Sequence, residues 1–196
     1  MNTEPIQLCA WRHPKPKGAQ GRCIGQTDLL VDKRKAKRLA HRIRQAARQH
    51  QWPRVVHTSP LQRCALVGQQ LKRWGWQHHV HADLSEMSFG IWDGLPWSAI
   101  SHAEVDAWCA DFLHGQPGQG ESLHQLFKRL STWVQPQAAR HTQPPCLIVA
   151  HAGCMQAWQW LSTGKALPTD AAQWPQPPAY GACWALAILA SINTGL

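Results

Sequence analysis

Short apolar runs alternate with longer stretches of helical periodicity along most of the chain. Five runs are too short for helices and predict β-strands over residues 6–11, 54–57, 80–84, 146–150 and 184–189. Apolar spacing and breaker residues predict helices over residues 33–48, 61–74, 101–113, 121–134 and 154–161. This alternation predicts an α/β fold, a three-layer α/β/α sandwich with a mostly parallel central sheet. Because there is no internal repeat and no long linker, residues 1–196 are predicted to form a single domain.

Two of the predicted helices carry distinctive signals. Ser101 and Glu104 have the spacing of a capping box, which marks a helix N-terminus. Residues 33–48 place Leu39, Ile43 and several alanines on one helical face, with many Lys and Arg residues elsewhere. This pattern predicts an amphipathic surface helix with a solvated basic side. The alternative, a nucleic-acid-binding arm, lacks interleaved aromatic residues and any groove-reading motif, so we expect no nucleic acid partner.

The composition is that of a folded protein with a strong positive charge. Hydrophobic residues make up 44% and charged residues 16% of the 196 residues, which excludes a disordered chain. The formal net charge of +9 favours anionic partners, a class that includes nucleic acid, membrane surfaces and small phosphorylated molecules. The first ten residues do not resemble a secretory signal, and the apolar stretch 182–192 is too short to span a bilayer. We therefore expect a cytoplasmic protein without a membrane partner.

Histidine and arginine residues follow three of the predicted strands at the point where each strand ends. Arg12 and His13 follow residues 6–11, Arg63 lies about one helical turn beyond residues 54–57, and His151 follows residues 146–150. The carboxyl ends of parallel strands meet at one edge of a sheet, where such folds bind their ligands. We therefore expect two histidines and two arginines to converge at one rim.

Such a set has the chemistry that phosphoryl transfer requires. Guanidinium groups match the phosphate oxygens and stay charged, and a neutral imidazole is a nucleophile that needs no metal. The departing oxygen requires an acid, and Glu86, which follows the third predicted strand, is the best candidate. Burial at the rim would raise the pKa of this carboxyl enough for it to donate a proton. Taken alone, each residue could have an ordinary structural role, such as a surface ion pair, a helix cap or a solvated carboxylate. The prediction therefore depends on their joint placement.

Five landmarks follow one another in order over most of the chain: Arg12-His13, Thr58-Ser59-Pro60-Leu61-Gln62-Arg63, Glu86 with Phe89-Gly90-Ile91-Trp92-Asp93-Gly94, Gly120-Glu121-Ser122 and His151-Ala152-Gly153. In these the sequence resembles the histidine phosphatase superfamily, which also contains the cofactor-dependent phosphoglycerate mutases. The resemblance implies a phosphoglycerate mutase-like fold and a metal-independent phosphatase of the histidine acid type. It implies that His13 becomes a phosphohistidine, that Glu86 is the proton donor, and that Arg12, Arg63 and His151 hold the phosphate.

Within the superfamily, the short chain and the segment 89–94 most resemble the alpha-ribazole phosphatases of cobalamin synthesis. The sequence departs from the family pattern at Pro14, where a glycine is usual, and at Lys15, where an acidic residue is common. Pro14 removes a backbone N–H from the phosphate loop. The loop 21–28 is expected to touch the substrate, with Gly25 and Gln26 as the residues in contact.

Two alternatives to hydrolysis stay open at this point. One is phosphoglycerate mutase-type transfer, and the other is a non-catalytic protein that binds phosphate or nucleic acid. A metal site is not expected, because in His78-His79-Val80-His81 only His79 and His81 share a strand face and no further ligand pattern completes a site. We therefore predict no cofactor and a small phosphorylated metabolite as the partner; the oligomeric state cannot be predicted.

Overall fold

The computed structural model describes residues 5–138 and 144–188 of the chain. Five strands form one sheet in the order β3-β2-β4-β1-β5. The strands are β1 (Ile6–Arg12), β2 (Val55–Thr58), β3 (Gln77–Val80), β4 (Cys146–Ala150) and β5 (Cys183–Ile188). Neighbouring strands are parallel except for β5, which pairs with β1 in the antiparallel sense. The mostly parallel sheet predicted from the sequence is therefore confirmed.

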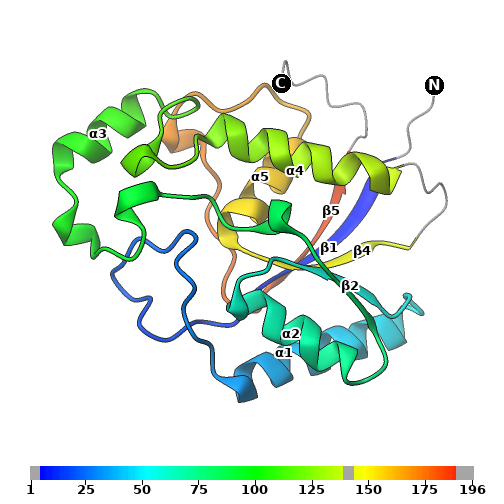
Figure 1. Cartoon of the computed structure of the whole chain (residues 1–196). Helices are drawn as coiled ribbons and strands as arrows, with labels where there is room; N and C mark the ends of the chain where they lie inside the picture. Colours follow the sequence, from blue (N-terminus) through cyan, green and yellow to red (C-terminus); the bar gives the residue numbers. More distant parts are fainter. Residues whose placement is uncertain (1–4, 139–143, 189–196) are drawn as a thin grey trace.

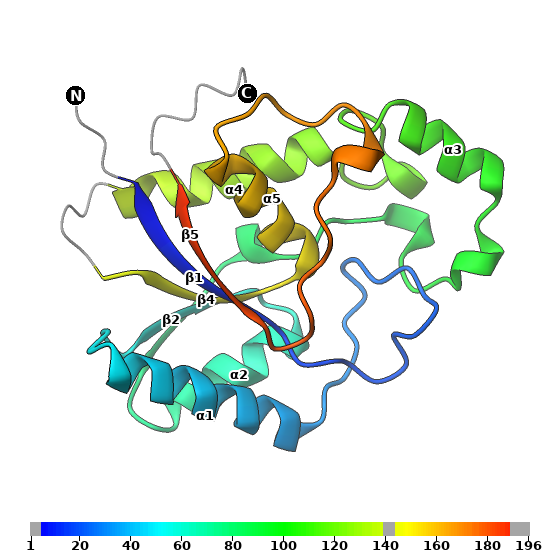
Figure 2. The same cartoon turned by 180° about the vertical axis from the view of Figure 1, so that it is seen from behind.

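Helices cover both faces of this sheet. The helices on the faces are α1 (Lys33–Gln49), α2 (Gln62–Lys72), α4 (Leu123–Ala138) and α5 (Ala152–Ser162), and α3 (His102–Ala110) lies beyond the sheet. Figure 1 shows α1 and α2 on one face and α4 and α5 on the other, and Figure 2 shows the same layers from behind. The α/β/α sandwich is thus confirmed. No helix in the described part of the chain is long and apolar enough to cross a membrane.

The central strand β1 explains why both faces need a cover. Side chains alternate across a strand, and nearly all those of β1 are apolar. Leu8 and Ala10 pack with α4 and α5, whereas Cys9 and Trp11 pack with α1 and α2. A strand that is apolar on both sides is stable only when each face is covered, as in parallel sheets generally.

One strand predicted from the sequence is in the wrong place. Residues 80–84 were predicted as the third strand, but β3 spans Gln77–Val80 and Ala82–Leu84 form a 3₁₀ turn. β3 is an edge strand with mostly exposed side chains, so it lacks the apolar signal of a buried strand. Leu84 is apolar because the turn inserts it into the core beneath α4. The last predicted strand is confirmed as Cys183–Ile188, and residue 189 lies outside the described residues.

Both helix signals in the sequence are confirmed. The Asp32 carboxylate caps α1, whose buried face includes Leu39 and Ile43, and its basic residues lie on the remaining faces. Ser101 and Glu104 form the expected capping box at the start of α3, although this helix ends at Ala110 rather than near residue 113. α3 and the short turns around it lie beyond the sheet, on the side where the parallel strands end (Figure 1).

Candidate active site

His13 directly follows β1 and is held by two carbonyl groups. Its backbone N–H donates to the Ala150 carbonyl oxygen at 3.0 Å, which ties it to the end of β4. Its side-chain Nδ1 lies 2.9 Å from the Pro14 carbonyl oxygen. Because a carbonyl oxygen only accepts, Nδ1 must carry the proton, which leaves the lone pair on Nε2. Pro14, which departs from the family pattern, thus orients the imidazole through its carbonyl group.

His13 is also kept uncharged. The side chain is buried, and its pKa is lowered to about 3 by desolvation, with further lowering by the nearby Arg63 and Arg12 charges. The hydrogen bond to Pro14 opposes this shift but does not outweigh it. A neutral imidazole with a free Nε2 is the form that can attack phosphorus.

His151 lies beside His13, with ring centroids 5.0 Å apart. It follows β4 and is fully buried. Its Nδ1 accepts a hydrogen bond from Arg63 Nε at 3.2 Å, so the proton of the neutral ring is on Nε2. Burial keeps the pKa of His151 well below its ordinary value, and the charge of Arg63 lowers it further. His151 therefore favours its neutral form, with an N–H group at Nε2.

The Cys64 thiol supports this orientation of His151. Its Sγ lies 3.4 Å from His151 Nε2 and donates toward the Ala150 carbonyl oxygen at 3.6 Å. Burial raises the pKa of this thiol well above its usual value, so it stays protonated. The thiol thus packs against the His151 ring, at 3.4 Å from Nε2 and 3.9 Å from Nδ1, while the bond from Arg63 determines the tautomer.

The Arg63 guanidinium is almost completely buried and is fixed by a loop from another part of the chain. Besides its bond to His151, it donates to the carbonyl oxygens of Thr27 and Gly25. A guanidinium has five N–H groups, so two are left for a ligand after these three bonds. Arg63 is therefore a preorganised cation for phosphate oxygens.

Gly25 and Gln26, which the sequence predicts in contact with substrate, lie at this site. Gly25 is buried and its carbonyl positions Arg63, whereas Gln26 is exposed and its side chain donates to the Glu86 backbone oxygen at 3.1 Å. A Cβ on Gly25 would collide with the Met87 carbonyl oxygen and with Asp93. The loop therefore approaches so closely that only glycine fits at position 25.

Glu86, whose backbone oxygen accepts from the Gln26 side chain, has a buried carboxyl group. Its two carboxylate oxygens accept from the backbone N–H groups of Met87 and Gly153, at 3.0 and 3.2 Å. Burial raises its pKa, although these two hydrogen bonds and the Arg63 charge act in the opposite direction. A carboxyl with a raised pKa is suited to donate a proton and later to take one back.

Arg12 differs from Arg63 in what it contacts. One of its N–H groups donates to the Pro178 carbonyl oxygen at 2.6 Å, and its guanidinium lies 3.9 Å from the ring centre of Tyr180. The Tyr180 ring also lies 5.6 Å from that of His13 and is 39% exposed. The buried Arg12 Nε has no hydrogen-bond partner among the residues that the structure describes. Arg12 thus lies at the rim with an unused donor, under an aromatic ring that is open to solvent.

The geometry brings two imidazoles, two guanidinium groups and one carboxyl to the carboxyl end of the sheet. The model of the histidine phosphatase superfamily (branch 1) matches residues 8–180 of the chain. The chain belongs to the histidine phosphatase superfamily. This match covers every residue named above, from Arg12 to Tyr180.

Individual relatives of the chain are more distant. An adenosylcobalamin/alpha-ribazole phosphatase of Salmonella typhimurium is 28% identical over 80 residues, 39% of this chain and 40% of that protein. The match thus spans well under half of that relative. The structure of a mycobacterial glucosyl-3-phosphoglycerate phosphatase is 24% identical, with a TM-score of 0.73 over 92% of this chain and 89% of that one. A protein of Thermus thermophilus is 21% identical, with a TM-score of 0.65 over 92% of each chain. These two structures share the fold.

Sequence reasoning missed three residues of this histidine phosphatase site. The Asp93 carboxylate accepts from the backbone N–H groups of Gly25 and Gln26, at 2.5 and 3.0 Å, and so shapes the loop that fixes Arg63. Asp93 lies in the landmark segment 89–94, which is a signal that could have identified it. Cys64 follows Arg63 directly but resembles an ordinary core cysteine, and nothing near Tyr180 in the sequence marks it.

The histidine-rich segment lies outside the site. His57 on β2 and His81 after β3 share a hydrogen bond between ring nitrogens at 2.9 Å, and the His57 and His79 rings stack. The structure thus adds His57 to the face that His79 and His81 share. Within residues 5–138 and 144–188, no group of three or more His, Cys, Asp or Glu side chains is arranged to hold a metal ion.

Proposed function

We propose that this protein hydrolyses a small phosphomonoester through a phosphohistidine on His13. The observation that carries the proposal is the geometry around His13: its Nδ1 is bonded to the Pro14 carbonyl oxygen, its Nε2 is left free, and its ring lies beside His151, which Arg63 orients. No metal is needed, because the nucleophile is unprotonated at any ordinary pH and the cations that bind phosphate are arginines.

In the first step, His13 Nε2 attacks phosphorus and the bond from phosphorus to the ester oxygen breaks. Glu86 gives its proton to that oxygen, so the alcohol leaves neutral. Charge on the phosphoryl oxygens is met by the two unused N–H groups of Arg63, by His151 Nε2–H and by Arg12.

In the second step, water attacks the phosphohistidine. Glu86, now ionised, takes a proton from the water as its oxygen bonds to phosphorus, and the bond to His13 Nε2 breaks. Inorganic phosphate leaves, and Glu86 is protonated again for the next cycle. The buried carboxyl with its raised pKa suits both halves of this cycle.

Alpha-ribazole phosphate is the proposed substrate. The support is the resemblance of residues 89–94 to the alpha-ribazole phosphatases and the partial match to the Salmonella protein of that name. The exposed Tyr180 ring at the rim adds physical support, because an aromatic surface beside the phosphate site is suited to stack against a flat base such as ribazole's.

Phosphate release from p-nitrophenyl phosphate in the presence of EDTA tests the reaction class. We expect turnover at the same rate with and without chelator. Turnover abolished by EDTA and restored by a divalent metal would instead indicate a metallophosphatase, and absence of turnover with tight phosphate binding would indicate a binding protein.

A substrate panel tests the finer proposal. We expect kcat/KM for alpha-ribazole phosphate to exceed that for 3-phosphoglycerate and for glucosyl-3-phosphoglycerate. A higher kcat/KM for either sugar acid would contradict this assignment. Formation of 2-phosphoglycerate from 3-phosphoglycerate, without release of phosphate, would identify mutase-type transfer.

The pH dependence tests the roles of His13 and Glu86. Because the pKa of His13 is lowered to about 3, its nucleophilic form persists far into acid, and kcat/KM should fall only as the pH approaches 3. Because the pKa of Glu86 is raised, its acid form persists above the usual carboxyl range, and kcat/KM should fall as the pH rises through that pKa. Initial rates, corrected for the ionisation of the substrate, should therefore define an acidic optimum.

The variant Glu86→Gln tests whether Glu86 causes the fall of the rate at high pH. It should be slow with alkyl phosphates, which need a proton for the leaving oxygen, and its rate should no longer fall with rising pH. It should lose less with p-nitrophenyl phosphate, whose leaving group departs as an anion. An unchanged pH profile in this variant would assign the proton transfer to another residue.

A further inference from the structure

The segment from α1 to just beyond β3 contains many basic residues and no acidic ones. Twelve of the 20 Lys and Arg residues lie between residues 33 and 82, Arg63 among them, and none of the 11 Asp and Glu residues does. The basic side chains of α1 are exposed except for Arg44, which is half-buried. This surface has no acidic residue within its own segment to neutralise it, so it attracts polyanions.

Beside this helix lies a hollow of about 410 Å³ that combines cations with aromatic rings. Its lining includes three arginines and three tryptophans: Arg44, Arg48, Arg54, Trp52, Trp74 and Trp76. Arg44 is held over the Trp74 ring, 4.6 Å from its centre, and Trp52 is stacked on His50 with ring centroids 4.7 Å apart. Arg44 is thus held against an aromatic ring, and Arg48 and Arg54 are exposed at the same hollow.

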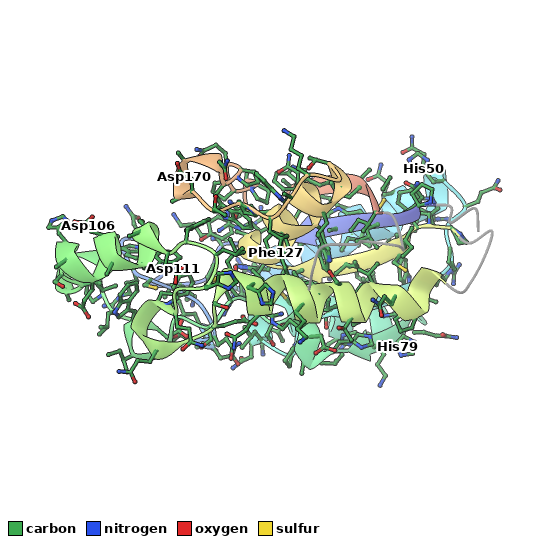
Figure 3. All side chains as sticks on the ribbon, turned by 90° about the horizontal axis from the view of Figure 1, so that it is seen from above. His50, His79, Asp106, Asp111, Phe127 and Asp170 are labelled. Atoms are coloured by element: carbon green, nitrogen blue, oxygen red, sulfur yellow. The ribbon has the colours of Figure 1, made fainter. Side chains whose placement is uncertain are left out.

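This hollow is remote from the candidate active site. Arg48 lies in the last turn of α1, while Trp52 and Trp76 precede β2 and β3. These positions are at the amino ends of the parallel strands, whereas His13 and His151 follow the carboxyl ends. Figure 3 shows His50, the stacking partner of Trp52, far from Asp106 and Asp111 in the region of α3. A ligand here occupies a site separate from the phosphate site.

The hollow continues along α1 rather than ending as an isolated pocket. A second hollow of about 540 Å³ shares Arg44 and Arg48 with the first and is also lined by His41. The helix has 17 residues and is therefore about 25 Å long, which matches several phosphates of a stacked strand at about 3.4 Å each.

We propose that the surface formed by α1 and the hollow of Trp52, Trp74 and Trp76 binds single-stranded nucleic acid. Backbone phosphates lie along the exposed basic residues of α1, and bases stack against the half-buried rings of Trp52 and Trp74, beside the buried Trp76. Proteins that bind single strands without sequence preference usually combine a row of basic residues along the phosphate backbone with aromatic side chains on which the bases stack. A phosphorylated protein would match the charge but would leave the aromatic rings without a partner, so a nucleic acid is favoured.

This surface could not be predicted from the sequence, because its basic residues and its tryptophans lie in different segments of the chain. Residues 33–48 contain the cations and no aromatic residue, which argued against a nucleic acid partner. The tryptophans come from the segments that precede β2 and β3, and only the packing of α1 against α2 brings them to the same place. We therefore revise the expectation of no nucleic acid partner.

Fluorescence anisotropy with a labelled single strand of about twelve nucleotides tests the proposal. We compare it with an abasic strand that has the same number of phosphates. The abasic strand should bind at least about tenfold more weakly, because it lacks the stacking of bases. Affinity should fall steeply with salt as counterions are released. Equal affinity for the two strands would reduce the surface to a general polyanion site and overturn the proposal.

Two matched variants locate the binding surface. Arg48→Gln with Arg54→Gln removes two exposed charges at the hollow, and Lys128→Gln with Lys165→Gln removes two exposed charges on other elements. The arginine variant should lose about tenfold in affinity, whereas the lysine variant should lose no more than about twofold. Equal losses in the two variants would contradict a defined site. Circular dichroism and the thermal midpoint confirm that each variant is folded.

Two competitors separate this site from others. Saturating inorganic phosphate at matched ionic strength should leave strand binding unchanged, because it occupies only the site of Arg63 and His151. Displacement of the strand by phosphate would place the strand in the active site and overturn the proposal. Adenosine monophosphate should compete far more weakly than the strand itself; equal competition would identify a mononucleotide site instead.

Discussion

Replacing His13 with alanine is expected to reduce turnover of p-nitrophenyl phosphate by a factor on the order of 10⁴ or more. His13 Nε2 is the only nitrogen of this ring with a free lone pair, because Nδ1 donates to the Pro14 carbonyl oxygen. The variant therefore lacks the atom that accepts the phosphoryl group, while Arg63 and His151 can still bind the substrate. Initial rates at saturating substrate measure the loss, and rapid quenching of the wild type should trap an acid-labile phosphohistidine that the variant does not form.

The control for this variant is His124→Ala. His124 lies in the first turn of α4 and its ring packs on that of His114, so its removal should leave the rate unchanged. His13→Ala should keep its circular dichroism spectrum, since the ring makes one side-chain hydrogen bond and lies at the rim of the core. Activity like that of the wild type in the folded variant would rule out His13 as the nucleophile.

Replacing Arg63 with alanine is the second change with a large expected effect, a loss of about a hundredfold or more in kcat/KM. The guanidinium is almost fully buried, so its charge acts on the phosphoryl oxygens with little screening by water. Its removal also takes away the donor that Arg63 supplies to the Gly25 carbonyl oxygen and to His151 Nδ1, whereas the Thr27 carbonyl oxygen keeps the Leu29 backbone N–H at 3.1 Å. The loss should be larger in kcat than in substrate binding if the charge serves mainly the transition state.

Two further variants separate chemistry from structural support at this position. Arg63→Lys retains a charge but cannot form the same three hydrogen bonds, so it should stay well below the wild type. Arg73→Ala serves as the matched control, because this exposed arginine follows the last turn of α2, the helix that contains Arg63 in its first turn. Partial rescue of Arg63→Ala by added guanidinium would support a direct role. An effect of less than threefold would place Arg63 outside the phosphate site.

Much of the fold was readable in the sequence because its signals are local. β1 and β4 are nearly continuous apolar runs, which a strand needs when both of its faces are buried. α1 shows its helical period and α3 its capping box in neighbouring residues. The edge strand β3 was misplaced for the same reason: it buries little, so it lacks an apolar pattern, while the nearby Leu84 has one without being in a strand.

The candidate site was readable to the extent that strand ends predict a common rim. Arg12, His13, Arg63 and His151 follow predicted strands, and parallel strands end at the same edge. The loop of Gly25, by contrast, is held next to Arg63 by a distant residue. The Asp93 carboxylate accepts from the Gly25 backbone N–H, and the Gly25 carbonyl oxygen accepts from Arg63. Tyr180 comes from a segment without periodic pattern, and it lies near Arg12 through the pairing of β5 with β1.

By itself the sequence determined the layers of this histidine phosphatase, the strands that bear its reactive residues and the chemical types of those residues. These follow from the periodicity of side chains and from the identity of functional groups, which are properties of neighbouring positions. Only the tertiary structure decided which nitrogen of His13 is free, which tautomer His151 adopts and how many donors Arg63 has left. Those depend on the Pro14 carbonyl, on the Arg63 Nε–H and on a distant loop, because a hydrogen bond forms only where two groups meet and is not a property of either one alone.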